Sequence, residues 1–282
     1  MADSDLNKPQ TGKPRLAVFK FASCDGCQLS ILSLEEDLLI LDQAVDIAYF
    51  PEASSNMQEG PYDVALVEGS ISTPEHLHQI AEIRDQSRIL ITIGACATAG
   101  GLQALRNFAD ADHFTEVVYT HPEYIESLST STPVSEHVKV DFELWGCPID
   151  KVQLRQMLSD LLAGVAPKLP GSSLCQECKR EAHTCVLVAK GEPCLGPVTR
   201  TGCGAICPSM GRACYGCFGP ADLSFPHDRE QANAASLAER FATELNMDED
   251  EIRRRFHLIY SYMSPFREIG DKPDGKMEKH DE

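Results

Sequence analysis

Residues 15–27, RLAVFKFASCDGC, join a β-rich run directly to a closely spaced pair of cysteines. The run at 15–21 has the apolar and aromatic composition of a strand. Further β-rich runs lie at 45–50, 63–68, 88–93, 116–119 and 138–144. Helical periodicity fits residues 28–41, 74–86, 100–109 and 150–163. Strands that alternate with helices predict βαβ units, and therefore an α/β fold with a mostly parallel sheet.

Cysteines follow three of the predicted strands. Cys24 and Cys27 come after 15–21, Cys96 comes after 88–93, and Cys147 comes after 138–144. Ligands of parallel sheets bind at the carboxyl ends of the strands, so we expect these four side chains to meet at one edge of the sheet. Glu68 ends the strand at 63–68 at the same edge. It is either a buried carboxylate that handles protons or a carboxylate that caps nearby amides.

A second group of cysteines is concentrated in 43 residues near the end of the chain. Residues 174–226 show little periodicity and cannot form an apolar core of their own, so bound metal must organise them. Four thiolates are the ligand set of one cubane iron–sulfur cluster. The twelve cysteines of the chain therefore predict three clusters and a path for electrons. The second group is Cys175, Cys178, Cys185, Cys194, Cys203, Cys207, Cys214 and Cys217.

Other kinds of site compete with this interpretation. Structural zinc also accepts four cysteines, and it competes most strongly for the second group. The pair Cys24 and Cys27 could be a thioredoxin-like redox motif, but that leaves Cys96 and Cys147 unexplained. A disulfide scaffold is not expected in a reducing compartment. Neither GxGxxG nor GxxxxGK[ST] occurs, so we expect no nucleotide site on this chain.

Composition limits the possible partners and location. The chain has 282 residues, a hydrophobic fraction of 43% and a formal net charge of −18. The length suggests one large or two ordinary domains, and the charge argues against nucleic acid or an anionic membrane as the main partner. No apolar run approaches the length of a membrane span, and the N-terminus has no secretory signal pattern. We therefore expect a cytoplasmic protein with no membrane contact.

The predicted domain organisation has four parts. Residues 1–14 are polar and expected to be disordered, and 15–166 form the α/β domain. A linker, PKLPGSS, opens an irregular cluster domain at 167–263. Two C-terminal helices, at 229–245 and 248–262, are expected to cover the clusters. Residues 264–282 are charged and expected to form a mobile tail.

Four motifs of the first half belong together: Cys24-Asp-Gly-Cys27, Val67-Glu68-Gly69, the run from Gly94 to Gly101 around Cys96, and Trp145-Gly-Cys147-Pro148. As a set they resemble the small subunit of nickel–iron hydrogenases. The downstream runs from Gly191 to Cys203 and from Cys214 to Pro220 match the cluster domain of that family. The resemblance covers roughly residues 15–226. It implies a flavodoxin-like N-terminal domain followed by the small iron–sulfur domain with C-terminal helices.

The resemblance also assigns the clusters. It places a proximal cluster on Cys24, Cys27, Cys96 and Cys147, a distal cluster on Cys175, Cys178, Cys185 and Cys194, and a medial cluster on Cys203, Cys207, Cys214 and Cys217. The last two sets could interleave. Periplasmic relatives have histidine at the position of Cys175 and proline at that of Cys207. The cysteines found here imply three [4Fe-4S] clusters and low reduction potentials.

This pattern is most similar to the small (delta) subunit of cytoplasmic NAD(P)-linked hydrogenases of the sulfhydrogenase type. In such a complex the Ni-Fe site belongs to a large subunit, while FAD and NAD(P) bind to flavin subunits that work with ferredoxin-like subunits. The chain is then expected to conduct electrons between these partners without a catalytic residue of its own. Three alternatives remain: a deazaflavin-reducing or heterodisulfide-reductase-linked hydrogenase, a cluster subunit of respiratory NADH–quinone oxidoreductase, and a zinc-stabilised interaction module.

Overall fold

The computed structural model describes residues 12–222 and 233–269 of the chain. These residues form two compact units, the first comprising residues up to 170 together with 217–219, and the second comprising 171–216 and the residues from 220 onward. Among the described residues, no helix has the length and apolar character that crossing a membrane requires.

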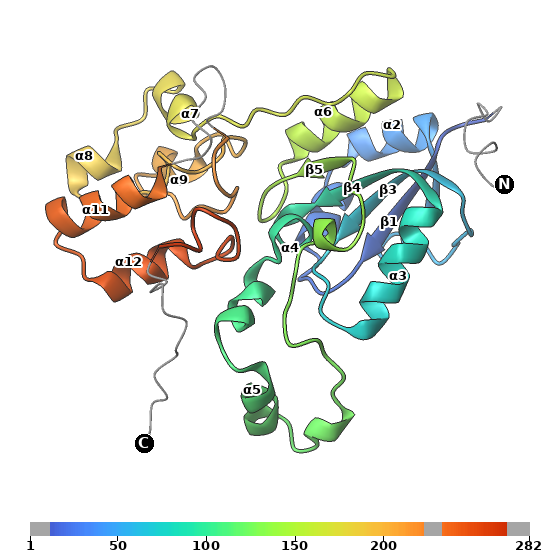
Figure 1. The fold of residues 1–282 in the computed structure, drawn as a ribbon. Coiled ribbons are helices and arrows are strands. Elements are labelled where there is room, and N and C mark those ends of the chain that lie inside the picture. The colour runs from blue at the N-terminus through green and yellow to red at the C-terminus, as the bar shows by residue number, and fades with distance from the viewer. Residues whose placement is uncertain (1–11, 223–232, 270–282) are drawn as a thin grey trace. The chain divides into compact units, whose positions relative to one another are not determined.

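The first unit is built on one five-stranded sheet in which every pair of neighbouring strands is parallel (Figure 1). The strand order is β2-β1-β3-β4-β5, which is the flavodoxin-like order. The predicted α/β fold is therefore confirmed. The strands are β1 (Arg15–Lys20), β2 (Asp46–Tyr49), β3 (Tyr62–Glu68), β4 (Ser87–Ile93) and β5 (Phe142–Leu144).

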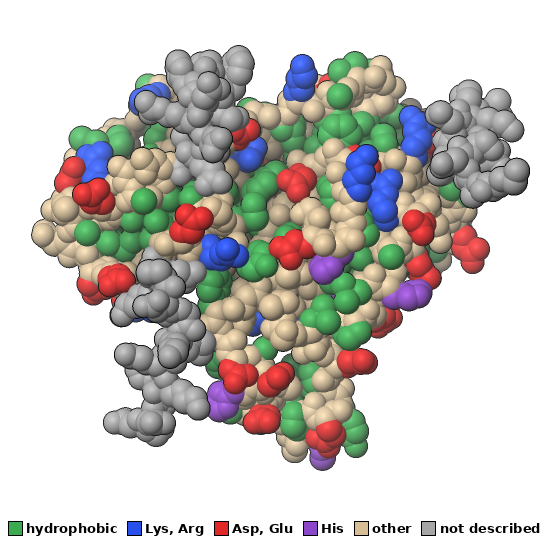
Figure 2. Space-filling model, in the orientation of Figure 1, with side chains coloured by type: hydrophobic (Ala, Val, Ile, Leu, Met, Phe, Trp, Pro, Cys, Tyr) green, Lys and Arg blue, Asp and Glu red, His purple; other side chains and the backbone are tan. Residues whose placement is uncertain are grey.

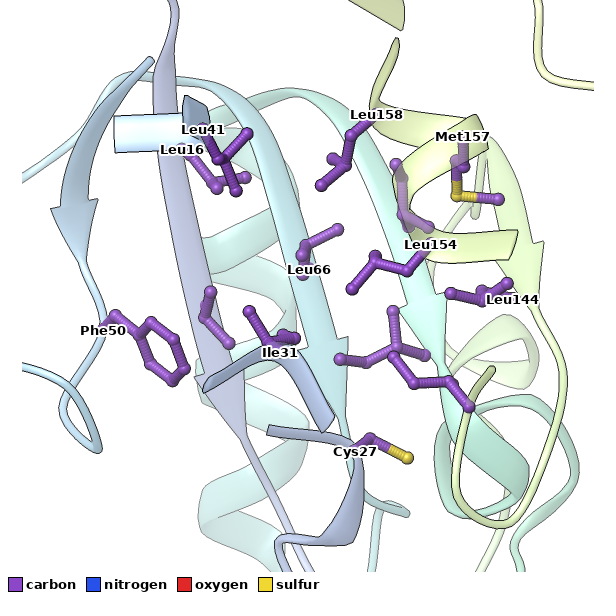
Figure 3. Packing of buried hydrophobic residues seen from close by; sticks show 14 of the residues in the cluster. Leu16, Cys27, Ile31, Leu41, Phe50, Leu66, Leu144, Leu154, Met157 and Leu158 are labelled. Atoms are coloured by element: carbon purple, nitrogen blue, oxygen red, sulfur yellow. The ribbon is translucent and has the colours of Figure 1, made fainter. Parts of the chain in front are cut away.

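Helices cover both faces of this sheet because alternate strand residues point to opposite sides. On one face Leu66 and Ile91 pack with residues of the helical segments, among them Leu154 and Leu158 (Figure 3). On the other face Val67 and its neighbours pack against Ile80. The helices of the first unit are α1 (Gly26–Leu32), α2 (Glu36–Ala44), α3 (Pro74–Asp85), α4 (Gly94–Ala99), α5 (Ala111–Val118) and α6 (Lys151–Leu162), with 3-10 helices η1 (Leu102–Phe108), η2 (Pro122–Tyr124) and η3 (Val134–Glu136).

Several local predictions differ from the structure. Two elements are shorter than predicted, since the strand predicted at 138–144 spans Phe142–Leu144 and the helix predicted at 248–262 spans Glu249–Phe256. The strand predicted at 116–119 is helical as far as Val118, where α5 ends, and the Asp110 side chain caps the start of that helix by accepting from the amides of Asp112 and His113. The single helix predicted at 28–41 is two helices, α1 and α2, separated at Glu35, whose φ is 55°. The helix predicted at 100–109 is the 3-10 helix η1.

The second unit contains short helices and, in its described part, no named strand. A cluster of aromatic side chains forms its core, and Phe256 lies 5.7 Å from Phe266, ring centroid to ring centroid. Phe266 is fully buried, so residues 264–269 belong to the fold although a mobile tail is predicted there. The helices are α7 (Cys175–Arg180), α8 (Val186–Lys190), α9 (Ile206–Ser209), α11 (Ala234–Glu244) and α12 (Glu249–Phe256).

Several predictions fall outside the described residues. These are the disorder of residues 1–11, the start of the helix predicted at 229–245, and the tail at 270–282.

Candidate metal centres

The structure brings the four cysteines of the first unit to one edge of the sheet. Cys24 and Cys27 lie where β1 leads into α1, Cys96 lies in α4 directly after β4, and Cys147 follows β5. The β4 and β5 loops are joined there by a hydrogen bond from the Ala95 amide to the Gly146 carbonyl, at 2.8 Å. Cys27, Cys96 and Cys147 each lie close enough to at least one other cysteine of the set for its charge to raise their pKa.

Gly94 shows how closely these loops approach one another. Its φ is +81°, and a Cβ at this position would lie only 2.2 Å from the Sγ of Cys27. Only glycine accepts both that backbone conformation and that neighbour. The end of β4 is therefore shaped to leave space for the Cys27 sulfur.

Burial favours the thiol form at three of the four positions, Cys27, Cys96 and Cys147. It raises the pKa of Cys27 and of Cys147, and it raises the pKa of Cys96 to about 12. A hydrogen bond from the Ile149 backbone opposes the raised pKa at Cys27. The Cys96 thiol donates to the side-chain oxygen of Gln103 at 3.3 Å, and the Gln103 amide group donates to the Ala22 carbonyl at 3.0 Å. Metal binding deprotonates a coordinating thiol outright, so this set, in which Cys27 is buried, Cys96 and Cys147 are partly buried and Cys24 is exposed, fits a group that supplies positive charge.

Glu68 lies beneath the same edge and is only 1% exposed. Its carboxylate accepts from the backbone amides of Cys27 at 3.1 Å and of Gln28 at 3.3 Å. Burial raises its pKa, while the Gln28 side chain and the two amides oppose that effect. This geometry is that of the amide-capping alternative, in which Glu68 anchors the start of α1 and thereby positions Cys27.

In the second unit, four of the cysteines line one cavity. Cys175 and Cys178 come from α7, Cys185 precedes α8, and Cys194 comes from the following loop. The other lining residues are mostly apolar, including Leu174, Val186 and Leu187. Burial raises the pKa of both Cys175 and Cys178. A cavity of thiols and apolar side chains suits a compact cluster that must be shielded from water.

Of the remaining cysteines, Cys203, Cys207 and Cys214 belong to the same unit as this set. The amides of Ile206 and Ala205 favour the thiolate of Cys203, although burial raises its pKa. The Cys214 amide donates to the Cys194 sulfur at 3.2 Å, and the Gly216 amide donates to the Cys214 sulfur at 3.4 Å. Cys217 groups with the first unit. Its assignment to the set of Cys203, Cys207 and Cys214 therefore stays a prediction from the sequence.

The state of the thiols bears on the competing kinds of site. All twelve cysteines are described and all are free, so the disulfide alternative has no support. Within residues 12–222 and 233–269, no group of three or more His, Cys, Asp or Glu side chains is arranged to hold a single metal ion.

Three side chains at these sites were not predicted. Gln103 contacts the Cys96 sulfur, and Glu177 and Arg255 contact the loops that carry the last cysteines. Glu177 lies between Cys175 and Cys178, so its position could have drawn attention to it. Arg255 lies 41 residues beyond Cys214, and nothing in the local sequence marks it.

Comparison with known proteins places this fold and its cysteines in a class. Residues 24–161 match the family model described as NADH ubiquinone oxidoreductase, 20 Kd subunit. Over these residues, which include the whole sheet from β2 to β5, the chain is therefore similar to the α/β class of that subunit. Within this class, the chain belongs to the family of hydrogenase small (delta) subunits.

The relatives that show this family align over most of their length. Sulfhydrogenase 2 subunit delta of Pyrococcus furiosus is 40% identical over 207 residues, which are 73% of this chain and 86% of the relative. A vhu subunit of the F420-non-reducing hydrogenase of Methanocaldococcus jannaschii is 32% identical and covers 86% of this chain and 94% of its own. The NAD-reducing hydrogenase HoxS subunit delta of Cupriavidus necator is also 32% identical, over 60% of this chain and 88% of its own.

A solved structure agrees with this family. A chain from the NAD+-reducing [NiFe]-hydrogenase in the H2-reduced state superposes with a TM-score of 0.52 at 30% identity. The match covers 56% of this chain and 96% of the solved chain.

Proposed function

We propose that this chain is the electron-transfer small subunit of a nickel–iron hydrogenase and carries three [4Fe-4S] clusters. The observation that supports this most strongly is the meeting of Cys24, Cys27, Cys96 and Cys147 at one sheet edge, although they come from three separate strand ends. The cavity shared by Cys175, Cys178, Cys185 and Cys194 adds a second set. In the proposal Cys203, Cys207, Cys214 and Cys217 hold the third cluster.

When bound, each cluster would accept and release one electron at a time. The chain's own residues would hold the clusters and limit the access of water. Glu68 positions Cys27 through its amide contacts, and Leu174 and Leu187 line the cavity of the second set. Amides aimed at Cys203 and Cys214 would stabilise charge on those sulfurs. No catalytic residue is assigned to this chain, because the Ni-Fe site would belong to the large subunit.

The proposed electron acceptor is an NAD(P)-linked flavin subunit. Two relatives support this choice, the sulfhydrogenase delta subunit and the delta subunit of an NAD-reducing hydrogenase. The absence of a dinucleotide motif from the sequence agrees with a nucleotide site on a partner. We propose a cytoplasmic location for the complex, where its thiols would stay reduced before cluster assembly.

One observation favours a second acceptor. The F420-non-reducing hydrogenase subunit of Methanocaldococcus jannaschii aligns over 86% of this chain, a larger share than either the sulfhydrogenase or the NAD-reducing relative covers. The alternative is therefore a hydrogenase of that kind, whose electrons pass to a different partner subunit.

A partner subunit would also cover apolar side chains that the first unit exposes. Helix α5 has no buried residue, and Phe114, Val117 and Val118 are each more than half exposed. Figure 2 shows acidic and histidine side chains among apolar ones over this part of the surface. Residues 107–138 contain no Lys or Arg. This surface would suit a partner subunit that offers apolar and basic side chains.

The test is the metal content and acceptor preference of the native complex, purified without oxygen. Nickel at about one equivalent per chain, with more than the roughly twelve iron atoms that three cubanes need, is expected. Hydrogen-dependent reduction of NAD+ or NADP+ would identify the first acceptor, and reduction only through another partner would favour the second. Iron without nickel would point to a respiratory-type subunit. Zinc without acid-labile sulfide would contradict electron transfer.

A further inference from the structure

Two side chains of opposite charge bridge the loops that carry the last cysteines. Glu177 lies in α7 between Cys175 and Cys178. Its carboxylate accepts from the amides of Gly202 at 3.0 Å and of Ala205 at 3.2 Å, on either side of Cys203. One carboxylate thus links the helix of the distal set to the loop of the medial set.

The other bridging side chain is Arg255 of helix α12. Its Nε donates to the Pro193 carbonyl at 2.8 Å, directly before Cys194. Its guanidinium also donates to the Cys214 carbonyl at 3.0 Å and lies 4.1 Å from the centre of the Tyr215 ring. Arg255 therefore connects the loop of Cys194, from the distal set, to the loop of Cys214, from the medial set. Glu177 makes the same kind of connection with a negative charge.

The loops that these charges join also contact each other directly. The Leu195 amide donates to the Cys214 carbonyl at 3.1 Å, beside the bond from the Cys214 amide to the Cys194 sulfur. Both Glu177 and Arg255 are partly buried. Solvent ions screen a partly buried charge less than an exposed one. The charges of Glu177 and Arg255 therefore still affect the electrostatic potential at the neighbouring cysteine loops.

We propose that Glu177 and Arg255 are positioning residues that set the reduction potentials of the distal and medial clusters together. This inference rests on the proposed function, since it requires clusters on both sets of cysteines. A negative charge disfavours an added electron and a positive charge favours it. Glu177 therefore lowers both potentials and Arg255 raises both. Because each side chain bridges the two sets, neither cluster is tuned independently of the other.

The experiment is a redox titration of the intact complex, followed by low-temperature EPR. Glu177→Gln removes the charge but retains a hydrogen-bonding side chain, and we expect both midpoint potentials to rise. Arg255→Gln is expected to lower both. A shift on the order of tenfold in the ratio of reduced to oxidised cluster corresponds to about 59 mV for one electron. Arg255→Lys keeps the positive charge, so we expect both midpoint potentials to stay close to those of the unmodified complex.

Matched controls separate bridging from general charge. Glu181→Gln and Arg254→Gln remove the same charges from exposed neighbouring positions that form no such bridge, and should shift neither potential comparably. Iron and sulfide analysis of the unmodified complex tests the clusters themselves, so their absence would refute the proposed function and this inference with it. With clusters present, unchanged potentials or a shift in only one cluster would overturn the inference alone. Loss of a cluster in Arg255→Lys as well as in Arg255→Gln would show a purely structural role.

Discussion

At the scale of single residues, Gly94 leaves the space that the Cys27 sulfur of the first cysteine set occupies. We expect Gly94→Ala to prevent the proximal cluster from forming and to destabilise the first unit, because the new Cβ would overlap the Cys27 sulfur. Strain of this kind is typically about 1–3 kcal/mol for the backbone alone. Iron per chain and the urea midpoint measure the two effects. Gly164→Ala is the control, since Gly164 has φ +71° but a Cβ there would meet no atom within 4 Å. Full iron content in Gly94→Ala would contradict the expected overlap.

Asp141 is a second residue of interest, because its carboxylate holds together the strands β4 and β5 that precede Cys96 and Cys147. It accepts from the Arg84 guanidinium at 2.7 Å and from the Leu90 amide at 2.9 Å, next to the strand that leads to Cys147. Burial alone would raise the pKa of Asp141, but the Leu90 amide and Arg84 together hold it below its ordinary value of 3.8. The ionised carboxylate therefore stabilises the fold above pH 3.8, and this stabilisation is lost as the pH falls through the lower, folded-state pKa.

Asp141→Asn should consequently reduce the free energy of unfolding by about 1.5–3 kcal/mol at neutral pH. The difference from the unmodified chain should shrink as the pH falls below the ordinary aspartate value. Urea unfolding at several pH values measures this dependence, with Asp85→Asn, an exposed position, as the control. A difference that stays constant down to acid pH would show that the carboxylate charge is not the cause.

At the scale of elements, the start of helix α12 determines where Arg255 lies. The Asp248 side chain accepts from the Glu251 amide at 2.8 Å, and the Glu251 side chain accepts from the Asp248 amide at 3.2 Å. This reciprocal capping box satisfies two amides that the helix leaves unpaired. It also fixes the first turn of the helix that presents Arg255 and the buried Phe256.

We expect Asp248→Ala to destabilise the second unit by about 1 kcal/mol, because the Glu251 amide loses the side-chain oxygen to which it donates. Hydrogen exchange of the α12 amides is the most direct measurement and should become faster. Glu249→Ala removes a charge from the same turn but neither capping bond, so it should have a smaller effect. Equal exchange rates in the two variants would mean that helix-dipole charge, rather than the capping box, stabilises this end.

At the scale of the whole molecule, the two units differ in what stabilises them. The first has a five-stranded sheet with apolar clusters on both faces. The second has α11 and α12 around its aromatic core, but α7, α8 and α9 have only six, five and four residues. Isolated helices shorter than about 12 residues are marginal in water. The second unit is therefore expected to depend on bound metal far more than the first.

Removal of iron from the full chain should consequently loosen the second unit selectively. We expect amides of α7 and α8 to lose protection from hydrogen exchange, while amides of β1, β3 and β4 keep theirs. Hydrogen exchange with mass spectrometry, before and after chelation and again after reconstitution, measures both regions in one sample. Protection of α7 and α8 that survives complete loss of iron would show that the second unit folds without metal.

The sequence by itself was sufficient for the class of fold and for the meeting of the first four cysteines. Alternating strands and helices require a parallel sheet, and strand ends of such a sheet share one edge, so Cys24, Cys96 and Cys147 could be placed without coordinates. Only the tertiary structure decided that residues 116–118 are helical and that Glu35 separates α1 from α2. It also revealed Glu177 and Arg255, whose partners lie 25 to 62 residues away along the chain. Periodicity reports which face of an element is buried, but contacts between distant loops depend on how the whole chain packs.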